Sequence, residues 1–161
     1  MVSLVYTSLP QFSIGFLSEE IEQIVELKKE IIARKPLENI RMHHIAYQNK
    51  WYPLFDLQKI FAIPHPSPVR YAIMIKNTAG NILCGICTPN PVEEISVSEK
   101  NILPFPAFLL QKQSLCLLYA YVQTNTLSLF LGSLTDIWHP IAIAQYLLHT
   151  TPLPSLTGGQ P

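Results

Sequence analysis

Two cysteines three residues apart are the strongest hint of chemistry in this sequence. Cys84 and Cys87 form the motif CGIC. A reactive C-x-x-C pair usually lies at the start of a helix, where the dipole lowers the thiol pKa. Here the motif lies in the apolar segment NILCGIC, which has the composition of a strand, and residues three apart in a strand point to opposite faces. We therefore expect these thiols, and Cys116 in SLCLL, to be buried structural side chains.

Histidines and paired carboxylates give weaker signals. His43 and His44 are adjacent, so in a strand they face opposite ways and do not hold one ion. The sequence contains no second C-x-x-C and no H-x-x-x-H, so we predict no metal site. The sequential pairs Glu19-Glu20 and Glu93-Glu94 are typical of solvated faces. Because the phosphate-binding glycine loops and the G-x-S-x-G motif are also absent, the sequence predicts no cofactor and favours a binding module over an enzyme.

The composition excludes several classes of partner. Eleven Lys and Arg balance eleven Asp and Glu, so no net field draws in nucleic acid or an anionic membrane. Hydrophobic residues make up 48% of the chain, yet no apolar run reaches the roughly 18 residues of a membrane span. The N-terminus lacks the pattern of a signal peptide, and three cysteines cannot all pair with one another. We expect a reducing, cytoplasmic setting.

Short apolar runs separated by turn residues predict a mainly β protein. We expect a strand pair in SLVYTSLPQFSIGFL, two strands joined near Gln48-Asn49-Lys50, and a hairpin around NTAG with Gly80 at a positive φ. Another hairpin is expected around QTN. The apolar spacing in SEEIEQIVELKKEIIARKP predicts a helix near residues 18–33, with Ser18 as its N-cap, and short helices are expected near 134–148. Residues 151–161 have the composition of a disordered tail.

The segment WYPLFDLQKIF joins a strand to a short turn of helix. Pro53 cannot donate to a strand ladder, which predicts an edge strand or a bulge there. Asp56 stands where an N-cap belongs, and Leu57, Ile60 and Phe61 then share one helical face. We therefore interpret Asp56 as a cap and not as a catalytic carboxylate.

The order of these features, from about residue 2 to 148, resembles the CheW-like family of chemotaxis adaptor domains. IRMHHIAYQNKWYPLFDLQKIFAIP is similar to that family's G-v-i-n-l-R-G-x-i-v-P-v-i-D-L-r-x-x-l-g-l-p, with Pro53, Asp56 and Leu57 at its Pro, Asp and Leu. RYAIMIKNTAGNILCGIC resembles the next motif, with Gly85 at its glycine. NILPFP resembles the d-I-x-p-p-P that follows. The family's R-G, whose arginine is associated with receptor contact, appears here as Gln48-Asn49.

The resemblance implies a fold and a function. The fold would be mainly β, with two small five-stranded SH3-like β-barrel lobes, short helices, one domain over residues 1–150, and a crossover near 62–69. The function would be that of a non-enzymatic adaptor in a chemotaxis-type or motility two-component pathway. Its partners would be the regulatory domain of a CheA-like histidine kinase and a chemoreceptor. The protein would be cytoplasmic, recruited to membrane-associated receptor arrays without inserting into the membrane.

Turn residues that flank the lobes are the candidate partner-binding positions. They are Gln48, Asn49 and Lys50 on one turn and Asn77, Thr78 and Asn81 on another. Two functions from other classes remain open at this point. One is a thiol redox protein that uses Cys84 and Cys87, and the other is a β-barrel carrier of an apolar ligand.

Overall fold

The structure, a computed structural model, describes residues 1–106 and 118–133. Most of these residues lie in strands that form two sheets. The first sheet contains β1 (Val2–Ser8), β2 (Ser13–Leu17), β9 (Val92–Val97), β10 (Ile102–Pro104), β11 (Leu118–Gln123) and β12 (Ser128–Gly132). The second contains β3 (Ile21–Glu26), β4 (Ile32–Leu37), β5 (Ile40–Tyr47), β6 (Lys50–Asp56), β7 (Tyr71–Lys76) and β8 (Ile82–Thr88). The helical elements of the described residues are α1 (Leu57–Ile60) and the 3₁₀ turns η1 (Ser18–Glu20), η2 (Lys29–Ile31) and η3 (Glu99–Asn101).

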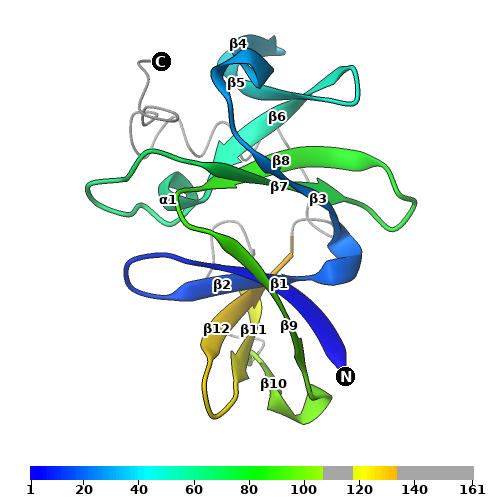
Figure 1. Cartoon of the computed structure of the whole chain (residues 1–161), viewed down its shortest axis with the longest axis vertical. Coiled ribbons are helices and arrows are strands. Elements are labelled where there is room, and N and C mark those ends of the chain that lie inside the picture. The colour runs from blue at the N-terminus through cyan, green and yellow to red at the C-terminus, as the bar shows by residue number, and fades with distance from the viewer. Residues whose placement is uncertain (107–117, 134–161) are drawn as a thin grey trace.

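The two sheets form two lobes, one above the other in Figure 1. Lobe A comprises residues 1–20, 89–106 and 118–133, with strand order β10-β11-β12-β2-β1-β9. Lobe B comprises residues 21–88, with strand order β3-β7-β8-β6-β5-β4. Neighbouring strands are antiparallel except for the parallel pairs β12–β2 and β6–β8. The predicted mainly β fold of two lobes is confirmed, with six strands in each sheet where five were expected.

Lobe B curls toward a barrel. The hydroxyl of Tyr47, at the end of β5, donates to Oε1 of Gln23 in β3 at 2.7 Å, although three strands separate β5 from β3 in the sheet order. Within residues 1–106 and 118–133, no strand pairing closes either sheet into a ring. In the described residues, lobe B is therefore a curled open sheet and lobe A an open sheet.

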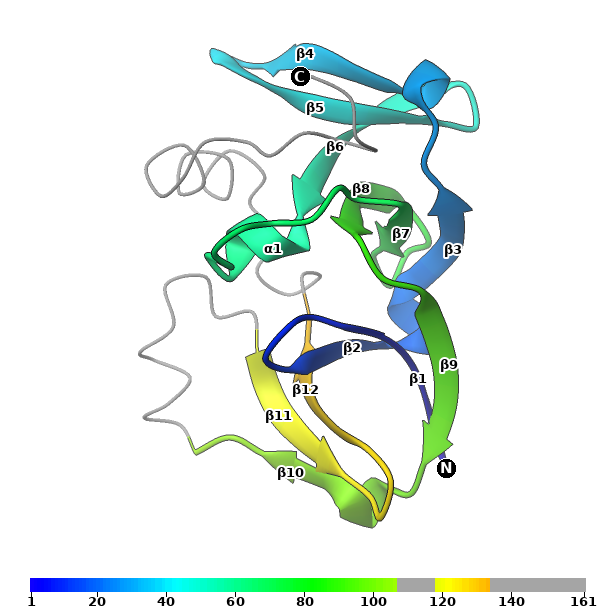
Figure 2. The ribbon, with the colours of Figure 1, turned by 60° about the vertical axis from the view of Figure 1, so that its left-hand side comes forward.

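The chain leaves lobe A through η1 and returns through residues 89–91, as the turned view of Figure 2 shows. The crossover predicted near 62–69 falls elsewhere, because those residues connect α1 to β7 within lobe B. Gln58 ties this connection to α1: its side-chain Nε2 donates to the carbonyl of Ser67 at 2.9 Å, and the backbone N–H of Ser67 donates to its Oε1 at 2.8 Å.

Three hydrophobic clusters hold the fold together. One fills lobe A and includes Leu4, Val97, Ala120, Val122, Leu129 and Leu131. A second fills lobe B and includes Leu27, Ile45, Leu54, Val69, Ala72, Met74 and Cys87. The third joins the lobes, because Ile14 and Phe16 of β2 pack with Phe55, Ile73 and Ile86 of lobe B. This shared cluster fixes the two lobes against each other.

The helix predicted over 18–33 is wrong. Ser18 begins the 3₁₀ turn η1 and caps nothing with its side chain, and β3, η2 and β4 follow. The apolar residues that gave the helical spacing are β-branched, which suits a strand. Pairing with β7 decides the outcome: Ile21 lies opposite Ile75 and Ile24 opposite Ile73, with a bulge between Ile21 and Gln23 that breaks strict alternation.

The prediction that Pro53 marks an edge or a bulge is also wrong. β6 lies between β8 and β5, and its pairings show no register shift. It pairs with β5 through residues 50–53 and with β8 through residues 54–56, so the ladders on its two sides are staggered. Pro53 therefore lies just before the β8 ladder begins, where a missing N–H leaves no bond unmade.

Three predictions lie outside the described residues: the helices near 134–148, the tail at 151–161 and the burial of Cys116. In the described part of the chain, no helix has the length and apolar character needed to cross a membrane.

Candidate protein-interaction site

The turn between β5 and β6 is formed as the sequence predicts. Gln48 and Asn49 have φ of 50° and 65°, and Tyr47 pairs with Lys50 across them. Two successive positive φ angles are those of a tight hairpin turn whose twist matches the strands, and Asn tolerates this conformation well. The side chains of Gln48, Asn49 and Lys50 are exposed. The turn thus presents three polar groups on a fixed backbone.

The turn between β7 and β8 is held by its own first residue. The Asn77 N–H donates to the carbonyl of Asn81, and the Asn81 N–H donates to Oδ1 of Asn77, both at 2.9 Å. The Gly80 N–H donates to the carbonyl of Asn77 at 3.0 Å, and Gly80 has a φ of 85°, as predicted. Thr78 and Asn81 are exposed and Asn77 is half-buried. Asn77 therefore shapes the turn, while Thr78 and Asn81 face solvent.

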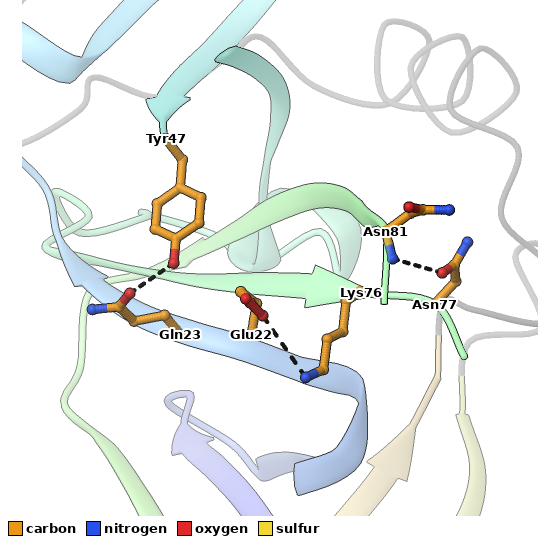
Figure 3. Close-up of polar contacts among 6 residues, drawn as sticks. All are labelled: Glu22, Gln23, Tyr47, Lys76, Asn77 and Asn81. Atoms are coloured by element: carbon orange, nitrogen blue, oxygen red, sulfur yellow. Dashed lines mark hydrogen bonds and ion pairs between the residues drawn. The ribbon is translucent and has the colours of Figure 1, made fainter. Parts of the chain in front are cut away.

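The fold brings these two turns to the same end of lobe B. β6 and β8 are parallel neighbours with Leu54 level with Gly85, so the turns that begin these two strands lie at one end of the sheet. Figure 3 shows how β3 is tied to both: Tyr47 donates to Gln23, and Lys76 Nζ lies 3.7 Å from Oε2 of Glu22. The six predicted binding residues thus belong to two turns on one sheet end.

A groove between the lobes continues from the second turn. It has a volume of about 590 Å³, and Asn77, Thr78 and Gly80 line it from lobe B. Leu17, Tyr119 and Ser133 line it from lobe A, and the Ser133 hydroxyl donates to Oε1 of Glu20 in η1 at 2.5 Å. No sequence pattern predicts these lobe A residues, because they are distant in the chain from the turn that they face.

Asp56 is the helix cap that the sequence predicts. Its Oδ1 accepts the Gln58 N–H at 2.9 Å, and Leu57 is fully buried beneath it. Asp56 is itself 4% exposed, and its Oδ2 has no hydrogen-bond partner within the described residues. Burial raises the pKa of Asp56 to about 6. The hydrogen bonds from Gln58 and the charge of Lys59 act in the opposite direction and lower this pKa, but burial has the larger effect. A cap this deeply buried affects stability as well as helix geometry.

Gly85 lies where a side chain would meet the core of lobe B. A Cβ built there comes 3.0 Å from Cδ1 of Leu54 and 3.2 Å from Cγ2 of Ile45 and from Sδ of Met74. The glycine therefore lets β8 approach β6 and β7 closely, which is a structural role and not a contact for a partner.

The two cysteines of CGIC are separated as the strand geometry predicts. Cys84 and Cys87 are free, at most 1% exposed, and belong to different clusters, Cys84 to the one between the lobes and Cys87 to the interior of lobe B. Burial raises the pKa of both thiols well above the ordinary value. This geometry is opposite to that of a redox pair.

We expect Cys84 and Cys87 of the native protein to react with iodoacetamide at least about 100-fold more slowly than in guanidinium, because buried groups must wait for local unfolding. Peptide mass spectrometry after labelling, with and without denaturant, measures this directly. A Cys84–Cys87 disulfide in the oxidised native protein would instead restore the redox interpretation.

His43 and His44 are both buried, and each is 6% exposed. Burial and the charges of Arg34 and Lys59 lower the pKa of His43, while burial lowers that of His44 despite the bond between its Nδ1 and the Met42 carbonyl. Among the residues that the structure describes, no three His, Cys, Asp or Glu side chains lie close enough together to bind a metal ion.

Comparison with known proteins adds one decisive likeness. No protein-family model and no curated protein sequence matches the chain. A solved structure of the scaffolding protein TtCheW from Thermoanaerobacter tengcongensis matches with a TM-score of 0.66, over 86% of this chain and 92% of that chain. The chain has a CheW-like fold. The sequence identity is 19%, so the likeness is one of architecture.

Proposed function

We propose that this protein is a non-enzymatic CheW-like adaptor. It couples the regulatory domain of a CheA-like histidine kinase to a chemoreceptor in a chemotaxis-type or motility two-component pathway, in the cytoplasm. The observation that carries the proposal is the CheW-like fold over most of the chain, shared with a protein described as a scaffolding protein. A scaffold works by presenting surfaces, so the residues to consider are exposed and held in a fixed conformation.

The two turns at the end of lobe B meet both requirements. Gln48, Asn49, Lys50, Thr78 and Asn81 are exposed. The pairing of Tyr47 with Lys50 fixes the first turn, and the bonds of Asn77 fix the second. A pre-formed turn loses little conformational entropy on binding, so its polar contacts contribute more to affinity than those of a mobile loop. We assign Asn49, Lys50, Thr78 and Asn81, with Asn77 as the turn former, to the kinase contact.

Receptor contact is assigned to Gln48, so that both partners can bind at the same time. Gln48 stands where the resemblance places a receptor-contacting arginine. A glutamine amide donates and accepts hydrogen bonds without charge, whereas arginine carries a fixed charge with five donors. We therefore expect a receptor contact here that depends little on salt.

The variant Lys50→Ala/Asn81→Ala is expected to weaken binding to the kinase regulatory domain by about tenfold or more, a loss of about 1.4 kcal/mol. It removes one side chain from each turn and leaves the Asn77 bonds that shape the second turn. Isothermal titration calorimetry against the regulatory domains of histidine kinases from the same genome provides the measurement.

The matched control is Gln123→Ala/Asn125→Ala, which trims two exposed residues at the β11–β12 hairpin of lobe A and should leave affinity unchanged. If no kinase domain binds the wild-type chain more tightly than about 100 μM, and no receptor tip does so either, the adaptor proposal is wrong.

A further inference from the structure

The neutral chain divides its charge between the lobes. Among the described residues, lobe A carries one lysine against five glutamates, and lobe B carries nine Lys and Arg against five Asp and Glu. The lobes therefore have net charges of −4 and +4, counted on side chains with neutral histidines. A neutral molecule with this division attracts a second copy in a head-to-tail arrangement.

Each lobe places part of its charge on the last strand of its sheet. β4 ends the sheet of lobe B and carries Arg34 and Lys35, whereas β9 ends the sheet of lobe A and carries Glu93 and Glu94. Within the described residues β4 pairs only with β5, and β9 pairs only with β1. A strand with one neighbour presents a row of backbone donors and acceptors on its other side.

The charged side chains on these strands are available to a partner. Arg34, Glu93 and Glu94 are exposed, and Lys35 is half-buried with Nζ 4.5 Å from the centre of the Trp51 ring. In the part of the chain that the structure describes, none of the four forms an ion pair. Glu93 accepts a hydrogen bond from the Tyr6 hydroxyl and Glu94 accepts one from the Ser3 hydroxyl, and these bonds orient both carboxylates.

We propose that β4 of one molecule pairs with β9 of a second copy of this chain, the basic edge against the acidic edge. In an antiparallel register Arg34 lies opposite Glu94 and Lys35 opposite Glu93. The same register therefore forms both ion pairs, and the two pairs lie on opposite faces of the joined sheet. Charge also selects the partner edge, because β4 against β4 and β9 against β9 would place like charges together.

The contact must be between molecules. Figures 1 and 2 both show β4 at the far end of lobe B and β9 in lobe A, so a single chain does not bring its own two edges together. The two edges are different surfaces, so the contact is heterologous, and a pair of molecules keeps one free β4 edge and one free β9 edge. Assembly then continues beyond a dimer, into a ring or an open filament.

Sedimentation velocity of the full chain tests the proposal. Near 10 mM salt, where charges act over about 30 Å, the average mass should rise above the 18.2 kDa of one chain as concentration increases. It should return to one chain near 1 M salt, where that distance is about 3 Å. We expect Arg34→Glu/Lys35→Glu and Glu93→Lys/Glu94→Lys each to stay monomeric at both salt concentrations.

A mixture of the two variants gives the decisive result. The acidic β4 of the first variant complements the basic β9 of the second, so association should return. A misfolded variant would not give this recovery. The control Lys28→Glu/Lys29→Glu makes the same change of charge on exposed residues outside β4. It should still associate at low salt, more weakly than the wild type because lobe B loses its net charge. A wild type that is monomeric at low salt, a control that is equally monomeric, or a mixture that stays monomeric overturns the proposal. Kinase binding through the lobe B turns would be unaffected by that outcome.

Discussion

Asp56→Asn is expected to stabilise the protein at neutral pH and to remove part of the pH dependence of unfolding. Asp56 is almost fully buried, and its Oδ2 has no hydrogen-bond partner among the described residues. Burial raises its pKa from 3.8 to about 6, so at neutral pH the folded protein holds an unfavourably buried charge. An asparagine Oδ1 accepts the Gln58 N–H equally well, so the cap is kept while the charge is lost.

The direction of the pH dependence follows from the raised pKa. Between about pH 4 and pH 6 the folded state keeps a proton that the unfolded state has released, so stability falls as pH rises through this window. A difference of about two pKa units corresponds to about 3 kcal/mol. Asp56→Asn should therefore match the wild type near pH 4 and exceed it by up to about 3 kcal/mol at neutral pH.

Urea unfolding of both proteins across this pH range provides the measurement. The difference between them isolates Asp56, because His43 and His44, whose pKa values are lowered, contribute the opposite slope to both proteins. Asp56→Ala measures the contribution of the cap without that of the charge. It should lower the free energy of unfolding by about 1 kcal/mol at a pH where Asp56 is protonated. An Asp56→Asn protein that keeps the wild-type slope, or is less stable at neutral pH, contradicts the argument.

Local rules predicted the turns and the cap correctly. Successive polar residues at Gln48-Asn49, the glycine at 80 and an aspartate before Leu57 each act over a few residues, and the structure forms each as expected. The separation of Cys84 from Cys87 follows from strand geometry alone. Where the physics is contained in neighbouring residues, one sequence is sufficient.

Nonlocal pairing explains what the sequence did not reveal. The spacing of apolar residues in 21–32 fits a helix, and only the partner β7 shows that Ile21 and Ile24 belong to a strand. Likewise Pro53 is acceptable inside a sheet because the ladders on the two sides of β6 are staggered, which depends on β8.

The candidate site also depends on nonlocal strand pairing. Each turn is readable from the sequence, but their common position depends on the parallel pairing of β6 with β8, which residues 57–81 separate in the chain. The groove beside the second turn adds residues from β2, β11 and the end of β12, because the lobes pack through β2. A parallel pairing between strands that are not consecutive leaves no local pattern to read.

Phe16→Ala is expected to cause the largest loss of stability, about 3–5 kcal/mol, the usual cost of removing a buried aromatic side chain. Phe16 is 1% exposed and belongs to β2 of lobe A, yet it packs in the cluster that includes Phe55, Ile73 and Ile86 of lobe B. The cavity would lie between the lobes. We therefore expect one cooperative unfolding transition at lower denaturant, and faster amide exchange in β7 and β8 as well as in β1.

Leu129→Ala is the matched control, because Leu129 is equally buried but packs only inside lobe A. If the shared cluster makes the lobes one cooperative unit, both variants lower exchange protection in both lobes, in proportion to their loss of unfolding free energy. If the lobes unfold independently, Leu129→Ala leaves β7 and β8 protected, and two transitions appear. That result would contradict a rigid connection through Phe16 and would allow the lobes to change their relative position when a partner binds.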